Sequence, residues 1–110
     1  MSADYYRKLI ARSKRMISRW DGADARLREL TKSHQTLRIV LTREGHEGNL
    51  IIACLEPETI QSPIAWSNAK IRIDTTHMSN GEIGVLVFDR TAIVEVKTGT
   101  FEVAENVKLK

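Results

Sequence analysis

The first twenty residues carry large apolar side chains at the spacing of a single helical face. Charged residues lie between them, so that apolar and polar positions separate onto opposite sides at 3.6 residues per turn. The apolar face consists of Tyr5, Tyr6, Leu9, Ile10, Met16, Ile17 and Trp20. This pattern predicts an amphipathic helix over residues 4–20, with Ser2 or Asp4 as its N-terminal cap and Gly22 as its C-terminal cap.

Residues 23–32 show a weaker helical pattern. Only Ala25, Leu27 and Leu30 offer apolar contacts in this stretch. The stretch is therefore predicted either to form a short second helix or to continue the first helix after a kink.

From Gln35 onward the pattern becomes that of short strands. Apolar and polar residues alternate, or apolar residues run together, and turns containing Gly separate the runs. Asn80–Gly81 and Thr98–Gly99 are two such turns. The predicted strands cover residues 36–43, 50–55, 69–74, 83–89, 92–97 and 100–105, and the tail over 106–110 is expected to continue as an edge strand.

These elements predict an α+β fold. One or two N-terminal helices would pack on an antiparallel meander sheet of about six short strands, because strands joined by short turns pair with their sequence neighbours. At 110 residues the chain is predicted to be a single domain, with a helical segment over 1–33 and a β segment over 34–110.

Two predicted strands, 50–55 and 83–89, are apolar on both faces. The helix can cover one face of the sheet, but the other face needs a cover of its own. Strong curvature, partial closure into a barrel or a second copy of the chain would each provide this cover. The pattern leaves a homo-oligomer open as an alternative to a sheet that curls on itself.

The stretch "EPETIQSPIAWSN", residues 56–68, is predicted to be a long loop. Pro57 and Pro63 disfavour a helix or a central strand across much of it. Long connections in compact domains often carry function. The alternative is that the loop crosses the end of the sheet and places Trp66 in the core.

The charge of the chain is unevenly placed. It has 17 Lys or Arg and 14 Asp or Glu, a formal net charge of +3 at pH 7. Residues 1–32 hold nine of the basic and four of the acidic residues, so the basic character belongs to the N-terminal third. The longest apolar run, Leu50–Leu55, is too short to cross a bilayer. A chain with one cysteine, Cys54, forms no internal disulfide, and a cytoplasmic location without a membrane partner is expected.

No motif for catalysis, metal binding or nucleotide binding stands out in the sequence. His34, His46 and His77 lack the spacing of metal ligands. Cys54 lies within an apolar run, where a thiol behaves as a small buried hydrophobe. Neither a metal nor a cofactor is predicted.

The predicted helix carries an unbroken band of positive charge. Lys8, Arg12, Arg15 and Arg19, named here the basic stripe, fall within an arc of about 60° at 100° per residue. No acidic residue occurs between positions 5 and 20, and like charges at i,i+4 cost roughly a few tenths of a kcal/mol each. The stripe is therefore predicted to bind an anionic partner. A solvated face, or compensation by acids elsewhere in the fold, is the alternative.

The sequence favours a non-enzymatic protein-interaction module, a small cytoplasmic inhibitor, immunity-type or regulatory protein. Its predicted binding residues are the basic stripe and Trp66, and its predicted partner is a protein with an acidic surface. Nucleic-acid binding through phosphate contacts of the stripe is the alternative. An enzyme would need a site such as Asp74, Asp89 and a histidine brought together by the fold.

Overall fold

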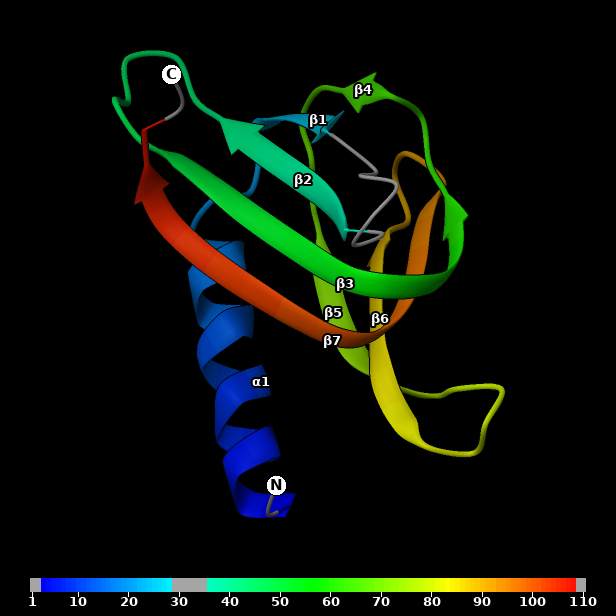
Figure 1. Ribbon diagram of the computed structural model, residues 1–110. Coiled ribbons are helices and arrows are strands. Elements are labelled where there is room, and N and C mark those ends of the chain that lie inside the picture. The colour runs from blue at the N-terminus through cyan, green and yellow to red at the C-terminus, as the bar shows by residue number, and fades with distance from the viewer. Residues whose placement is uncertain (1–2, 29–35, 109–110) are drawn as a thin grey trace.

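The computed structural model describes residues 3–28 and 36–108. Over these residues the chain forms one helix followed by seven strands (Figure 1). The elements are α1 (Ala3–Ser18), β1 (Asp24–Arg28), β2 (Thr36–Thr42), β3 (Asn49–Gln61), β4 (Ala65–Trp66), β5 (Arg72–His77), β6 (Ile83–Asp89) and β7 (Val94–Val107). The predicted α+β class is confirmed, with a single helix and one strand more than expected.

The helix forms where the apolar spacing predicts it, but it ends two residues early. Ser18 is its last residue, and the chain then turns through a hydrogen bond from Trp20 N–H to Ile17 O (3.0 Å). Ala23 N–H donates in turn to Trp20 O (3.1 Å). Gly22, at φ 92°, takes the left-handed conformation that suits glycine in this turn. Trp20 therefore belongs to the turn, where it is only 1% exposed.

The apolar face of α1 packs chiefly on β5 and, to a smaller extent, on β7. Ile10 and Ile17 are buried there as predicted. Tyr5, which was assigned to this face, is 56% exposed, because its position falls at the margin of the apolar arc. Ser13 lies near the centre of the arc and is buried. Within the described residues no helix is long and apolar enough to span a membrane.

The second helix predicted over 23–32 is wrong for the part that the structure describes. Asp24–Arg28 form β1, and residues 29–32 lie outside the described residues. Ala25 is buried between two exposed neighbours, as the alternation of a strand requires. β1 pairs with β2 on one side and with β4 on the other, so tertiary pairing overrides a weak local preference. The boundary between the helical and β segments consequently lies before residue 24, and not at residue 33.

The seven strands form one antiparallel sheet in the order β4-β1-β2-β3-β7-β6-β5. The order has two ends, β4 and β5, so the sheet is not closed into a barrel. In Figure 1 the long strands β3 and β7 lie side by side and bend together, with α1 descending at the lower left. The strong curvature that was predicted as an alternative is therefore present.

This bend takes the place of the turn that was predicted at Thr98–Gly99. β7 runs through this point without interruption, and Thr98 is fully buried. The Thr98 hydroxyl donates to Leu55 O (2.7 Å) on β3. Nearby, Glu56 adopts a left-handed φ of 51°, and the register between β3 and β7 shifts between Pro57 and Thr59. Such irregularities bend paired strands together, so the chain coils here instead of folding back as a hairpin.

Half of the predicted Pro/Trp loop belongs to β3. Residues 56–61 extend the strand, and they pair with β7. Pro57 is tolerated there because it lies at the register shift, where its missing N–H does not interrupt a regular ladder. The true loop before β4 consists of residues 62–64 only.

Both halves of the curled sheet contribute inner side chains to one core, and α1 packs against it. The largest buried apolar side chains are Ile17, Trp20, Ile39, Leu41, Leu50, Ile52, Ile71, Val85, Val87 and Val96. Outer side chains of the doubly apolar strands, such as Ile51 and Leu86, are half-buried. The curled sheet and α1 thus cover the inner face of these strands, whereas apolar side chains on the outer face stay partly exposed.

Gly84→Ala is expected to lower the free energy of unfolding by about 1–3 kcal/mol. A Cβ at this buried position in β6 would lie 2.7 Å from the Thr98 backbone oxygen and would also meet the side chain of Met78. The backbone oxygen belongs to the neighbouring strand and cannot move freely. Urea unfolding followed by circular dichroism measures the change.

Gly99→Ala is the matched control, because no atom lies within 4 Å of the Cβ that it would add. Its free energy of unfolding should stay within about 0.5 kcal/mol of the unmodified chain. Equal effects of the two substitutions would contradict the close packing assigned to Gly84.

Candidate functional site

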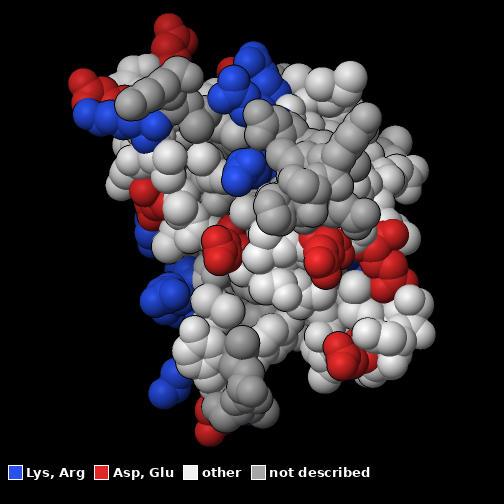
Figure 2. Space-filling model, viewed as in Figure 1, with Lys and Arg blue, Asp and Glu red and all other residues white. Residues whose placement is uncertain are grey.

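Three residues of the basic stripe lie along the exposed side of α1. Lys8, Arg12 and Arg15 are exposed, and none of them forms an ion pair with another described residue. They line a shallow depression of about 470 Å³ whose wall includes Tyr5 and Leu9. In Figure 2, Lys and Arg side chains follow the left flank of α1, whereas Asp and Glu side chains occupy the strands at the centre and right. After Asp4 in its first turn, the helix therefore presents only positive charges, and Lys8, Arg12 and Arg15 have no ionic partner among the described residues.

Arg19, the fourth residue of the basic stripe, has a different role. It follows the last residue of α1, and its guanidinium pairs with Glu105 of β7 at 2.7 Å. The same carboxylate accepts a long hydrogen bond from the Trp20 indole N–H (3.4 Å). The hydrogen bond from Arg19, helped by that from Trp20, holds the pKa of Glu105 below its usual value. Arg19 is thus compensated and ties the end of the helix to β7.

Trp66, the other predicted binding residue, is half-buried and lies away from the stripe. It is part of the short strand β4, which pairs with β1 through Trp66 and Ala25. Its indole N–H donates to Asp89 Oδ2 (3.0 Å). The ring packs against the main core, and Trp66 borders a different hollow from the one beside the stripe. The structure therefore does not bring Trp66 and the stripe into one site.

Asp89 is the one charged residue that is buried among the described residues, and the sequence did not single it out as structural. Its carboxylate is completely buried, and Oδ2 accepts from Trp66 and from Lys70 N–H (2.8 Å). Oδ1 accepts from Thr91 N–H (2.9 Å) and from the Thr91 hydroxyl (2.6 Å). Burial alone would raise the pKa of Asp89, but these hydrogen bonds together hold it below its usual value. The signal in the sequence was an Asp two residues before Thr, the pattern of an Asx turn.

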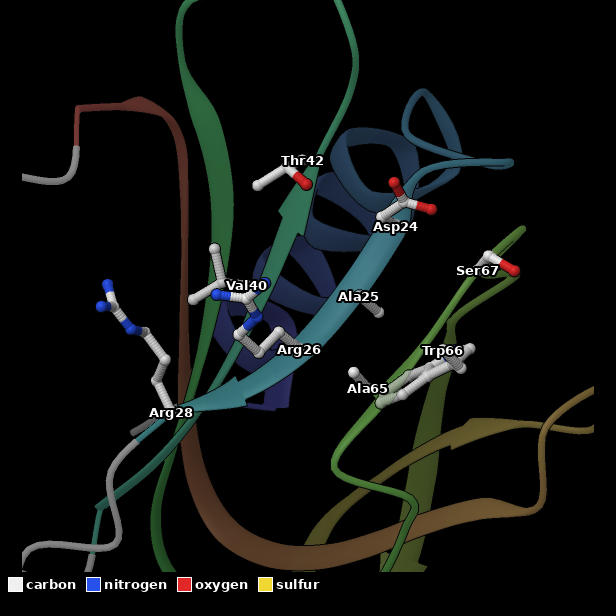
Figure 3. Close-up of a pocket in the computed structure, with 9 residues that line it drawn as sticks. All are labelled: Asp24, Ala25, Arg26, Arg28, Val40, Thr42, Ala65, Trp66 and Ser67. Atoms are coloured by element: carbon white, nitrogen blue, oxygen red, sulfur yellow. The ribbon is translucent and has the colours of Figure 1, made fainter.

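A second hollow, of about 470 Å³, lies beside β1 and β4 (Figure 3). Its lining includes two exposed arginines, Arg26 and Arg28, neither of which pairs with a described carboxylate. Figure 3 shows the Arg28 side chain extending away from Trp66, so the polar groups around this hollow do not converge on one point. The hollow offers two separate cations on a surface distinct from the stripe.

The remaining candidates for chemistry do not assemble into a site. Cys54 is buried, and burial raises the pKa of its thiol to about 12, the opposite of what a nucleophile requires. His46 lies edge-on to the Trp20 ring, whereas His77 ends β5. His34 lies outside the described residues.

The two carboxylates that were considered for an enzyme site already accept hydrogen bonds within the protein. Asp74 and Asp89 border the same hollow. Both carboxylate oxygens of Asp89 already accept hydrogen bonds, and Asp74 accepts from the N–H of Thr75 (2.8 Å). No histidine lines that hollow among the described residues. No group of three His, Cys, Asp or Glu side chains in residues 3–28 and 36–108 is arranged to hold a metal ion.

Comparison of the chain with protein-family models, with curated proteins and with solved structures gave no match. Its function is therefore argued from the geometry of its own residues. The feature with the clearest chemistry is the row formed by Lys8, Arg12 and Arg15.

Proposed function

We propose that this chain is a non-enzymatic protein-interaction module, a small inhibitor, immunity-type or regulatory protein that binds an acidic surface of another protein. The observation that carries the proposal is the row of Lys8, Arg12 and Arg15, exposed on one face of α1 and without a described ionic partner. The buried, free thiol of Cys54 is consistent with action in the reducing cytoplasm.

The contrast with Arg19 supports this reading. The chain places a carboxylate, Glu105, against the one stripe residue that anchors the helix. Among residues 3–28 and 36–108, no carboxylate pairs with the other three, although like charges three or four positions apart repel each other along a helix. A complementary acidic surface would relieve that repulsion and would also steer the partner toward this face.

A protein partner is favoured over nucleic acid by the position of the aromatic residues. Single strands are held by exposed aromatic rings between basic side chains. Trp20 is fully buried, Tyr6 is half-buried, and Trp66 is tied to Asp89. The exposed ring nearest the row is that of Tyr5, at one end of it.

The test uses two double variants that remove the same charge from different surfaces. Arg12→Ser/Arg15→Ser should weaken binding to the natural partner about tenfold, because each exposed ion pair contributes up to about 1 kcal/mol. Arg26→Ser/Arg28→Ser is the control, since these arginines are also exposed and unpaired among described residues. Proteins captured from nuclease-treated lysate by the unmodified chain would be purified, and their affinities for all three chains would be measured by titration calorimetry.

Two results would overturn the proposal. One is an equal loss of affinity in both double variants, which would indicate nonspecific attraction to net charge. The other is tight binding to 20-nucleotide single- or double-stranded DNA or RNA that falls steeply with salt and depends on Arg12 and Arg15, which would establish the nucleic-acid alternative.

A further inference from the structure

The strand β5 lies at one end of the sheet, and among the described strands only β6 pairs with it. In an antiparallel ladder the backbone N–H and C=O groups of every second residue bond to the partner strand. The backbone groups of the residues between them point away from that strand. The bond from Met78 N–H to Glu82 O (2.8 Å) fixes this alternation at the end of the β5–β6 pair. Counting back from Met78, the residues whose backbone groups face the open edge are Ile73, Thr75 and His77.

A second hydrogen bond supports the assignment of the Thr75 backbone N–H to the open edge. Its N–H donates to Asp74 Oδ1 (2.8 Å), the side chain of its own neighbour, and both residues are exposed. A charged side chain on an open edge protects it against unwanted strand pairing. The Asp74 carboxylate holds the place that the carbonyl of an added strand would take, so a strand that pairs with Thr75 has to displace this side chain.

A groove of about 460 Å³ runs between α1 and this edge. Ile17 of the helix and Ile73 of the strand contribute apolar lining, and the half-buried ring of Phe88 adds to it. The groove is the most apolar of the hollows described here. It offers a place for an apolar side chain directly beside the outward-facing backbone groups of β5.

The helix side of the groove is basic. Lys14 and Arg15 line it, and neither has a described ionic partner. On the strand side, Arg72 is neutralised by Asp21 through two hydrogen bonds of 2.8 and 2.9 Å. Asp74 also lines the groove there, and its carboxylate accepts from the Thr75 N–H. The available charge of the helix wall is therefore positive, and Arg15 belongs both to this wall and to the basic stripe.

We propose that an extended, acidic segment of the partner protein adds to the sheet at β5. Its backbone pairs with the outward-facing groups of Ile73, Thr75 and His77, an apolar side chain enters the groove, and acidic side chains meet Lys14 and Arg15. Strand addition of this kind takes affinity from main-chain hydrogen bonds and specificity from alternate side chains. This inference rests on the proposed function, because it names the form in which the acidic partner is bound.

The probe is a fluorescein-labelled peptide of four Glu-Val repeats, with four Lys-Val repeats as its charge control. Fluorescence anisotropy with the full chain should show binding of the acidic peptide only. Amide hydrogen exchange, read by NMR, should slow at Thr75 and His77 when the peptide is bound. A peptide of the same sequence with N-methyl groups on alternate residues should bind about tenfold more weakly, because it lacks the edge hydrogen bonds.

Two variants separate the contributions of backbone and charge. Thr75→Pro removes an N–H that faces outward, a position where proline is compatible with an edge strand, and should weaken binding about tenfold. Lys14→Glu/Arg15→Glu should reverse the preference toward the Lys-Val peptide, and it leaves the edge itself intact.

The inference is overturned if the acidic peptide binds without slowing exchange at Thr75, or if charge reversal leaves the peptide preference unchanged. It is also overturned if exchange at these amides slows with protein concentration alone, since a second copy of the chain would then occupy the edge. If the natural complex depends on Arg12 and Arg15 while Thr75 exchange is unaffected in it, strand addition fails and the proposed function stands. If no protein complex depends on these arginines, the proposed function fails.

Discussion

Asp89→Ala is expected to lower the free energy of unfolding by about 4 kcal/mol and the melting temperature by roughly 15–20 °C. The carboxylate is completely buried and accepts four hydrogen bonds, from Trp66, Lys70 and twice from Thr91. Alanine would leave these donors without an acceptor and would release β4 from the end of β6. Calorimetry and urea unfolding of the full chain measure both quantities.

Two further variants test whether the hydrogen bonds cause the loss. Asp89→Asn keeps one acceptor oxygen but sets an amide NH₂ against two of the donors, so it should cost nearly as much as alanine. Trp66→Phe removes a single donor and should cost about 1–2 kcal/mol. A loss below about 1 kcal/mol for Asp89→Ala would contradict the structural role assigned to this carboxylate.

The same group predicts how stability depends on pH. The pKa of Asp89 is lower in the folded chain than in the unfolded chain, where it is near 3.9. Its stabilising contribution is therefore complete above about pH 5 and is lost as the pH falls through the folded pKa. Unfolding followed between pH 6 and pH 2 should show a shallower decline in Asp89→Asn than in the unmodified chain.

Trp20→Ala is expected to lower the free energy of unfolding by about 3–5 kcal/mol. The ring is 1% exposed at the end of α1 and lies in the core cluster. The guanidinium of Arg43 lies 4.4 Å from the ring centroid, and His46 meets the ring edge-on at 4.9 Å. Removing the ring would leave a cavity and would loosen α1, with its row of cations, from the sheet.

Trp20→Phe is the matched control, because it keeps an aromatic ring and loses only the indole N–H and part of the volume. It should cost about 1–2 kcal/mol. Circular dichroism during urea unfolding is the suitable measurement, since the substitution removes one of the two tryptophan fluorophores. Similar losses for alanine and phenylalanine would indicate that the bond to Glu105, and not burial of the ring, holds the helix end.

The periodic elements could be predicted from sequence because local patterning decides them. α1 and the strand over 83–89 were placed to within two residues, and β2 was placed to within one. Each has an apolar face that only one periodicity can bury. The helical assignment of residues 24–28 failed because the local pattern was weak and pairing with β2 and β4 decided the outcome.

The candidate site could be predicted only in part. Lys8, Arg12 and Arg15 were found because the position of a residue on a helix face follows from its number. The role of Arg19 depends on Glu105, which is 86 residues away in the chain, and the position of Trp66 depends on Asp89. Neither partnership has a local signature, so Arg19 and Trp66 could not be separated from the other three residues without the structure.

The sequence by itself determined the amphipathic helix, the α+β class and the concentration of positive charge near the N-terminus. Only the tertiary structure decided that β3 and β7 bend together, that Asp89 locks β4 in place and that β5 is left with an open edge. The physical reason is the distance along the chain over which each kind of interaction acts. Side-chain periodicity acts within a few residues, whereas strand pairing and buried hydrogen bonds join residues that are distant in the chain, and their partners are specified only when the whole core is packed.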